Sequence, residues 1–178
     1  IRIYNYRDTK SIYYKDKKLM STNNLKLIGK HNLYNVMLVI GVLINHPFTK
    51  ENYRDIICSY HGEKYRLQKN YDGDFKIIND SKSTNFNALR VALESFKDNI
   101  VLIVGGMKRN DNFSLLDNQL MKIKSVYCYG ENKDEFFDYF FKNQIKCYKF
   151  NNIEEIVSNI KVVKNDIVLF SPGSISHD

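Results

Sequence analysis

Apolar residues in the first sixty positions form short runs separated by polar turns. The runs at 1–6, 12–14 and 25–28 predict short hairpin strands at the edge of something larger. Residues 33–44 are apolar on nearly every side, which predicts a helix buried between two layers. Thr49 is a candidate cap for a second helix. The apolar face of that helix would comprise Tyr53, Ile56, Ile57 and Tyr60.

From about residue 74 the pattern becomes a regular alternation of apolar runs and helix-like stripes. The runs that predict strands lie at 75–78, 100–104, 125–129, 146–150 and 167–170. Stripes around 88–96, 115–121, 136–141 and 153–160 predict the intervening helices. This alternation is typical of an α/β fold, here a Rossmann-like domain with a mostly parallel sheet. We place the boundary between the two parts after residue 56, so that the parts span 1–56 and 57–178.

Composition and charge narrow the possible partners. The net charge is +7, but the 27 basic residues include only six Arg and are mixed with acidic and Asn neighbours. Nucleic-acid binding usually needs Arg and Lys gathered on one face, so we expect none. A membrane-spanning helix needs an apolar run of ~18 residues, and the sequence has none, so we expect no membrane helix. The dispersed Cys58, Cys128 and Cys147 disfavour a disulfide framework and fit a reducing cytoplasm.

Ligands of parallel sheets bind beyond the carboxyl ends of the strands, so the loops after 78, 104 and 170 are the places to search. The first, residues 79–85, reads N-D-S-K-S-T-N and opens a helix. A helix N-terminus attracts anions, and Lys82 adds a positive charge while Asp80 offers an acceptor for ribose hydroxyls. The alternative is an ordinary polar loop in which Ser83, Thr84 or Asn85 caps the helix.

Four further polar stretches stand where ligands could bind. They are G-K-H-N-L-Y-N at 29–35, Y-R-L-Q at 65–68, G-G-M-K-R-N-D-N-F-S at 105–114 and S-P-G-S-I-S-H-D at 171–178. Together with D-S-K-S-T-N at 80–85, and in this order, they resemble the Mur ligase family over essentially the whole chain. The 80–85 loop and the last stretch are similar to those of the member that adds D-glutamate.

The resemblance implies a fold, a reaction and cosubstrates. Residues 1–56 would be the end of a central ATP-binding domain, and 57–178 an amino-acid-binding domain truncated at its end. The complete protein would use ATP and Mg²⁺ to join D-glutamate to UDP-N-acetylmuramoyl-L-alanine through an acyl phosphate. We expect a cytoplasmic monomer. The chain does not begin with Met, so we expect it to start inside a longer protein. It has no G-x-x-x-x-G-K-[ST] stretch, so we expect it to be inactive alone, with magnesium ligands upstream.

The resemblance also carries roles to matching positions on the nucleotide side. Asn35 would contact adenine, and Arg66 the phosphates or ribose. Asp80 would hold the ribose, while Lys82 would lie near the phosphates as a catalytic residue. Two neighbours depart from the family's pattern: Tyr65 replaces a His, and Gln68 replaces a Glu.

On the amino-acid side, the resemblance assigns the D-glutamate carboxylates to Thr84 and Ser176, with His177 beside them. Arg109 stands where the family has a catalytic Lys that binds the amino acid, although Lys108 could take that role. Two alternatives remain open. One is a related amide ligase of the folylpolyglutamate type, which D-S-K-S-T-N disfavours. The other is a degenerate nucleotide-sensing module, which the changes at 65, 68 and 109 would fit.

Overall fold

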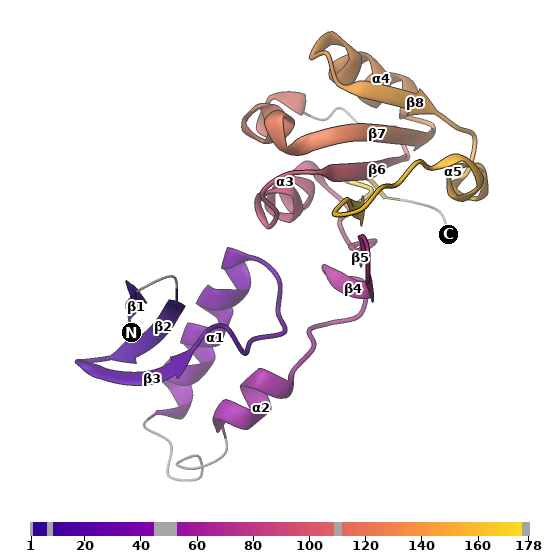
Figure 1. The fold of residues 1–178 in the computed structure, drawn as a ribbon. Coiled ribbons are helices and arrows are strands. Elements are labelled where there is room, and N and C mark those ends of the chain that lie inside the picture. The colour runs from indigo at the N-terminus through magenta and orange to yellow at the C-terminus, as the bar shows by residue number, and fades with distance from the viewer. Residues whose placement is uncertain (1, 7–8, 45–52, 109–111, 176–178) are drawn as a thin grey trace. The chain divides into compact units, whose positions relative to one another are not determined.

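The computed structural model describes residues 2–6, 9–44, 53–108 and 112–175. It divides into two compact units, Ile1–Gly62 and Glu63–Asp178, called unit 1 and unit 2 below (Figure 1). The predicted boundary after residue 56 falls within helix α2 (Tyr53–Ser59), which ends just before the division between the units. Among the described residues, no helix combines the length and apolarity needed to cross a bilayer.

Unit 1 contains a three-stranded antiparallel sheet and two helices (Figure 1). The strands pair in chain order and are β1 (Arg2–Tyr6), β2 (Thr9–Tyr14) and β3 (Lys17–Ser21). The first two expected strands are confirmed. The expected strand at 25–28 is wrong, because those residues form irregular backbone, and the third strand instead carries the buried Leu19 and Met20. The cap expected at Thr49 lies outside the described residues.

Helix α1 (Lys30–Leu43) packs one face against the sheet of unit 1. Val36 and Ile40 join Ile12 and Met20 in its core. The sequence predicts a helix buried on every side, and this prediction is wrong. Leu38 and Val42, on the face away from the sheet, are 70% and 72% exposed. Unit 1 supplies a single sheet layer to α1, and one layer buries only one face of a helix.

Unit 2 is built on a six-stranded sheet in the order β4-β5-β9-β6-β7-β8. Its edge strand β4 is antiparallel to β5, and the other neighbours are parallel, which confirms the α/β fold with a mostly parallel sheet. The strands are β4 (Gln68–Asp72), β5 (Lys76–Asn79), β6 (Ile100–Gly106), β7 (Ile123–Gly130), β8 (Lys146–Lys149) and β9 (Ile167–Phe170). The five expected strands are all present, whereas β4 was not predicted.

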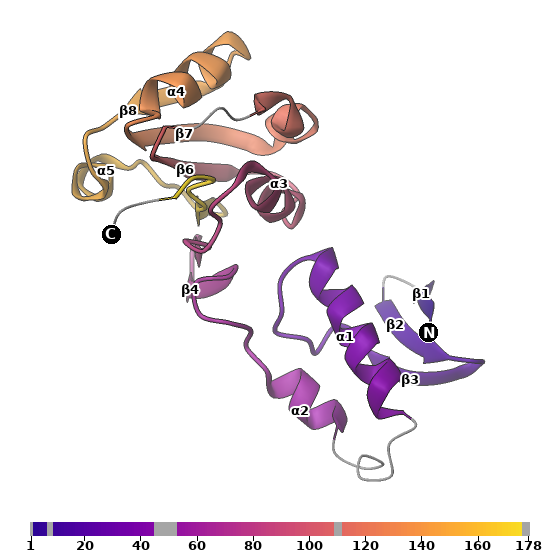
Figure 2. The same cartoon turned by 180° about the vertical axis from the view of Figure 1, so that it is seen from behind.

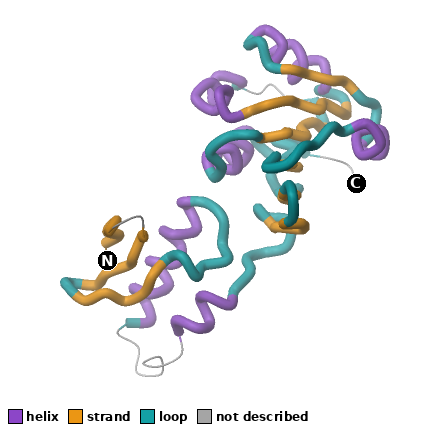
Figure 3. Tube along the Cα trace, viewed as in Figure 1, coloured by secondary structure: helices purple, strands orange, loops and turns teal. Residues whose placement is uncertain are grey.

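Helices flank this sheet (Figures 2 and 3). They are α3 (Phe86–Glu94), the 3₁₀ helix η1 (Phe113–Lys122), α4 (Lys133–Lys142) and α5 (Ile153–Asn159). Alternate residues of a strand face opposite sides, so Val101, Ile103 and Tyr127 share one face with Ile156 of α5. Phe86 of α3, Phe113 of η1 and Phe136 of α4 contact one another in a second cluster, where Phe113 meets both other rings edge to face.

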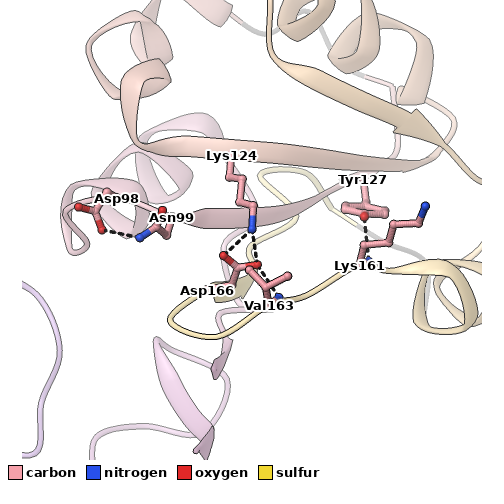
Figure 4. A network of polar contacts seen from close by, with 7 residues as sticks. All are labelled: Asp98, Asn99, Lys124, Tyr127, Lys161, Val163 and Asp166. Atoms are coloured by element: carbon pink, nitrogen blue, oxygen red, sulfur yellow. Dashed lines mark hydrogen bonds and ion pairs between the residues drawn. The ribbon is translucent and has the colours of Figure 1, made fainter. Parts of the chain in front are cut away.

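The amino-terminal edge of the sheet is held by an ion pair that spans three strands (Figure 4). Lys124 at the start of β7 donates to both carboxylate oxygens of Asp166, at 2.8 and 2.7 Å, across the intervening β6. Asp166, which is 2% exposed, also accepts from the amide of Val163 at 2.9 Å. Because the carboxylate is buried while the ammonium is partly hydrated, the Asp166 charge depends on Lys124 and on the Val163 amide for its compensation.

We predict that Asp166→Ala lowers the free energy of unfolding by about 2 kcal/mol, since the Val163 amide and the Lys124 ammonium lose their acceptor. Urea unfolding followed by circular dichroism measures the change. Asp72→Ala is the matched control, because Asp72 pairs with Lys69 in water and its loss should be nearly neutral. Equal effects of the two substitutions would contradict the assignment.

Candidate functional site

Four loops of unit 2 meet at the carboxyl-terminal edge of its sheet. They follow β5, β6, β7 and β9, and in this part of the chain they comprise residues 80–85, 107–108, 131–132 and 171–175. Since β5, β9, β6 and β7 are adjacent and parallel, their ends lie side by side. The three loops expected from the sequence are therefore brought together at one edge, with the loop after β7 added.

Main-chain hydrogen bonds tie these loops to one another. The amide of Asp80 donates to the carbonyl of Phe170 at 2.7 Å, and that of Gly173 to the carbonyl of Ser83 at 2.8 Å. On the other side of β9, the amide of Met107 donates to the carbonyl of Ile175 at 2.9 Å. The loop after β9 is thus held between the other two, and its position fixes both.

Asp80 is a buried carboxylate at the centre of this edge, 7% exposed. One oxygen accepts from the amide of Leu67 at 3.0 Å, and the other from the hydroxyl of Ser171 at 2.8 Å. The side chain therefore joins the segment before β4 to the end of β9. These two bonds turn Asp80 towards protein donors, in addition to any part in binding ribose.

The segment that Asp80 holds is a turn with an uncommon backbone. Tyr65 and Leu67 have φ values of 66° and 45°, a left-handed conformation that non-glycine residues adopt at a cost of roughly 1–3 kcal/mol each. Besides Asp80, the side chain of Gln68 accepts from the Tyr65 amide at 2.9 Å, and the Tyr65 carbonyl accepts from the amide of Lys82 at 3.1 Å. Arg66, between the two strained residues, is exposed. The turn thus presents a cation close in the fold to Lys82.

The 80–85 loop leads directly into the amino terminus of α3. Asn85 caps the helix by accepting from the amide of Ala88 at 3.0 Å, so the cap is neither Ser83 nor Thr84. Thr84 is exposed. Ser83 is buried, and its hydroxyl has no hydrogen-bond partner among the residues that the structure describes. An exposed Thr beside a helix amino terminus is suited to hold an anionic group.

The loop after β6 carries Lys108, whose ammonium lies 3.0 Å from a carboxylate oxygen of Glu135 on α4. The hydrogen bond that Lys108 donates to Glu135 raises the pKa of Lys108 above its ordinary value, so the ammonium stays charged and directed towards α4. Three predicted residues, Arg109, Ser176 and His177, lie outside the described residues. Their loops begin at this edge.

Asn35, the predicted adenine contact, belongs to unit 1, unlike Arg66 and Asp80. It is exposed in the first part of α1, and its amide donates to the side-chain oxygen of Asn32 at 3.3 Å. Asn32 in turn donates to the carbonyl of Ile28 at 2.7 Å. The Asn32 side chain therefore holds the amide group of Asn35, and Asn35 itself is exposed.

The described part of unit 2 offers neither a cluster of metal ligands nor a reactive cysteine. The described residues contain no group of three His, Cys, Asp or Glu that could hold a metal ion. Burial raises the pKa of the Cys147 thiol to about 11 and that of Cys128 further still, so both stay protonated at neutral pH. Neither cysteine is suited to act as a nucleophile.

Asn132 and Ser174 also lie in these loops, and the sequence motifs assigned no role to either. Both are buried and polar, and the amide of Asn132 donates to the hydroxyl of Ser174 at 2.7 Å. The only signal in the sequence was an Asn two positions after Gly130, where a buried strand ends.

Comparison with curated proteins finds relatives along nearly all of the chain, although no family model matches it. It is 35% identical over 173 residues to a UDP-N-acetylmuramoylalanine–D-glutamate ligase of Hydrogenobaculum sp., with 94% of the chain and 41% of the relative covered. The enzyme of the same name from Aquifex aeolicus is 34% identical over 179 residues, with 97% and 43% covered. The chain thus spans about two fifths of the length of these relatives.

Solved structures share the fold at lower sequence identity. The UDP-N-acetylmuramate-alanine ligase MurC of Thermotoga maritima superposes with a TM-score of 0.73 at 17% identity, with 94% of this chain and 40% of that chain covered. The folylpolyglutamate synthase of the same organism gives 0.66 at 13% identity, with 93% and 40% covered. A MurF ligase of T. maritima in complex with ADP gives 0.59 at 18%, with 97% and 42% covered. At these identities the likeness shows the fold alone.

We predict that Asp80→Ala releases the turn at 65–67, because the Leu67 amide and the Ser171 hydroxyl both lose their acceptor. The free energy of unfolding should fall by about 2–3 kcal/mol, and amide exchange at Leu67 should accelerate at least tenfold. Hydrogen exchange followed by NMR measures this. Asp98→Ala, which removes only an exposed contact to Asn99, is the control. Unchanged exchange at Leu67 in Asp80→Ala would show that the carboxylate does not hold the turn.

Proposed function

We propose that this chain, which belongs to the Mur ligase family, supplies the amino-acid-binding part of a longer ATP-dependent ligase that joins D-glutamate to UDP-N-acetylmuramoyl-L-alanine. Two observations carry the proposal. The curated relatives that match nearly the whole chain bear the name of this ligase, and the D-S-K-S-T-N loop lies at the carboxyl edge of the sheet. The folylpolyglutamate alternative has support only from fold likeness.

The amino-acid pocket is assigned to the loops after β5, β6 and β9. Thr84, exposed beside the amino terminus of α3, would hold one D-glutamate carboxylate together with Ser176 and the neighbouring His177. Arg109 would pair with the distal carboxylate. Lys108 is less suited to that role, because its ammonium is engaged by Glu135 on α4. A bidentate Arg–carboxylate pair is geometrically specific, which suits selection of one amino acid.

The nucleotide contacts of unit 2 are assigned to Arg66, Lys82 and Asp80, and Asn35 of unit 1 keeps the role of an adenine contact. The exposed Arg66 and Lys82 belong to segments joined by the bond between Lys82 and Tyr65, so two cations are available for phosphate groups. Asp80 would reach ribose only through an oxygen that also serves Leu67 or Ser171. The MurF ligase of the same fold is named as a complex with ADP, which makes a nucleotide a reasonable ligand for this fold.

The proposed reaction has two steps. A carboxylate oxygen of UDP-N-acetylmuramoyl-L-alanine forms a bond to the γ-phosphorus of ATP, and ADP leaves. The amine of D-glutamate then forms a bond to the acyl carbon, the C–O bond to phosphate breaks, and the amine protons pass to phosphate and solvent. Lys82 and Arg109 would act as catalytic residues by neutralising phosphate and carboxylate charge. The part of the chain that the structure describes contains no group of three His, Cys, Asp or Glu that could hold Mg²⁺.

In the complete protein, Arg109→Ala should raise the KM for D-glutamate roughly 10- to 100-fold, because a charge-assisted contact worth ~1.5–3 kcal/mol is lost. Arg109→Lys should recover much of that loss, and Lys108→Ala should have little effect because Lys108 faces Glu135. Phosphate release that requires both UDP-N-acetylmuramoyl-L-alanine and D-glutamate measures the KM.

Two results would count against this account. If Lys108→Ala is the damaging change while Arg109→Ala is silent, the amino acid is bound one residue earlier. If the complete protein binds ATP but releases no phosphate with both substrates present, the chain belongs to a nucleotide-sensing module and the proposed ligase activity is wrong.

A further inference from the structure

Asn132 occupies the junction of the loops that follow β6, β7 and β9. Its side-chain oxygen accepts from the amide of Gly106 at 2.9 Å. Its amide nitrogen donates to the hydroxyl of Ser174 at 2.7 Å and to the carbonyl of Met107 at 3.2 Å. The residue is 2% exposed, and these contacts use both ends of its amide. One side chain therefore connects the β6 loop to the β9 loop.

This use of the side chain is unusual for its position. Asn132 is the N-cap residue of α4, yet it makes no side-chain cap bond. The N-cap residues Asn85 of α3 and Asn152 of α5 instead accept from an amide of their own helix, as capping asparagines normally do. The stabilisation that Asn132 would give its helix is replaced by contacts to two loops. Such a replacement points to a role in those loops.

The loops joined by Asn132 approach too closely for a larger residue at Gly106. A Cβ atom there would lie 2.6 Å from the carbonyl oxygen of Ile175, and the φ of 152° is one that glycine tolerates best. The amide of Met107 donates to that same carbonyl at 2.9 Å. The spacing of the two loops is thus set by a glycine contact, a main-chain bond and the Asn132 side chain.

We propose that Asn132 is a positioning residue that fixes the spacing between the two loops carrying the amino-acid contacts. Arg109 follows Gly106 by three residues, and Ser176 follows Ser174 by two. The inference rests on the proposed function, in which these residues hold carboxylates of the same D-glutamate. A ligand gripped from two loops is sensitive to their separation, since displacement of about 1 Å can cost up to about 100-fold in rate.

The test compares two capping asparagines in the complete protein. Asn132→Ala should raise the KM for D-glutamate at least tenfold and change the KM for ATP less than twofold. Asn152→Ala, which removes a helix cap without touching these loops, should lower the Tm of the protein and leave both KM values unchanged. A merely structural Asn132 would behave like Asn152, with a lower Tm and an unchanged KM for D-glutamate, and that result overturns the inference.

A double-mutant cycle and a measurement of amide exchange in the absence of substrates complete the test. Ser174→Ala should raise the KM for D-glutamate, and its effect should be less than additive with that of Asn132→Ala because both remove one contact. Amide exchange at Gly106 should accelerate at least tenfold in Asn132→Ala. Full additivity or unchanged exchange contradicts the proposal. If the unsubstituted protein shows no D-glutamate-dependent activity, the proposed function is wrong whatever the exchange shows, and the positioning role falls with it.

Discussion

The arrangement of unit 2 depends on the pairing of its last strand. β9 lies between β5 and β6 and forms parallel hydrogen bonds with both, so it joins the β4–β5 pair to the β6–β7–β8 group. Buried strands must satisfy their main-chain groups on both sides, and β9 does this for β5 and β6 together. Its carboxyl end then emerges between the loops that follow those strands. The loops of the candidate site meet because β9, which follows β5–β8 in the sequence, completes the middle of the sheet.

Around the carboxyl end of β9, buried side chains add further hydrogen bonds between the loops that the main-chain hydrogen bonds already join. Asp80 links the end of β9 to the strained turn that presents Arg66, and Asn132 links the β9 loop to the β6 loop. Both act between segments distant in sequence, and both are removed from water, where such hydrogen bonds are more costly to lose. The exposed Arg66 and Lys82 therefore belong to segments that buried hydrogen bonds hold in place, and their charges can attract anionic ligands. At the opposite edge, the Lys124–Asp166 ion pair links the starts of β7 and β9 across β6.

The sequence predicted the elements that have strong local signals. The strand at 100–104 was predictable because buried parallel strands read as continuous apolar runs. β4 was missed because Gln68–Asp72 is almost wholly polar and is a strand only through its pairing with β5. The helix at 33–44 was predicted, but the exposure of Leu38 depends on how many layers surround it. The contact of Asp80 with Ser171 spans 91 positions and that of Asn132 with Ser174 spans 42, so no local pattern could show them.

The central claim is that the carboxyl-edge loops of unit 2 form one pocket for D-glutamate. A crystal structure of the complete protein with bound D-glutamate tests it most directly. We expect one carboxylate to lie within hydrogen-bond distance of Thr84 at the start of α3, with Ser176 on the same ligand and Arg109 at the distal carboxylate. An amino acid bound away from these loops, or Thr84 and Ser176 facing different ligands, would contradict it.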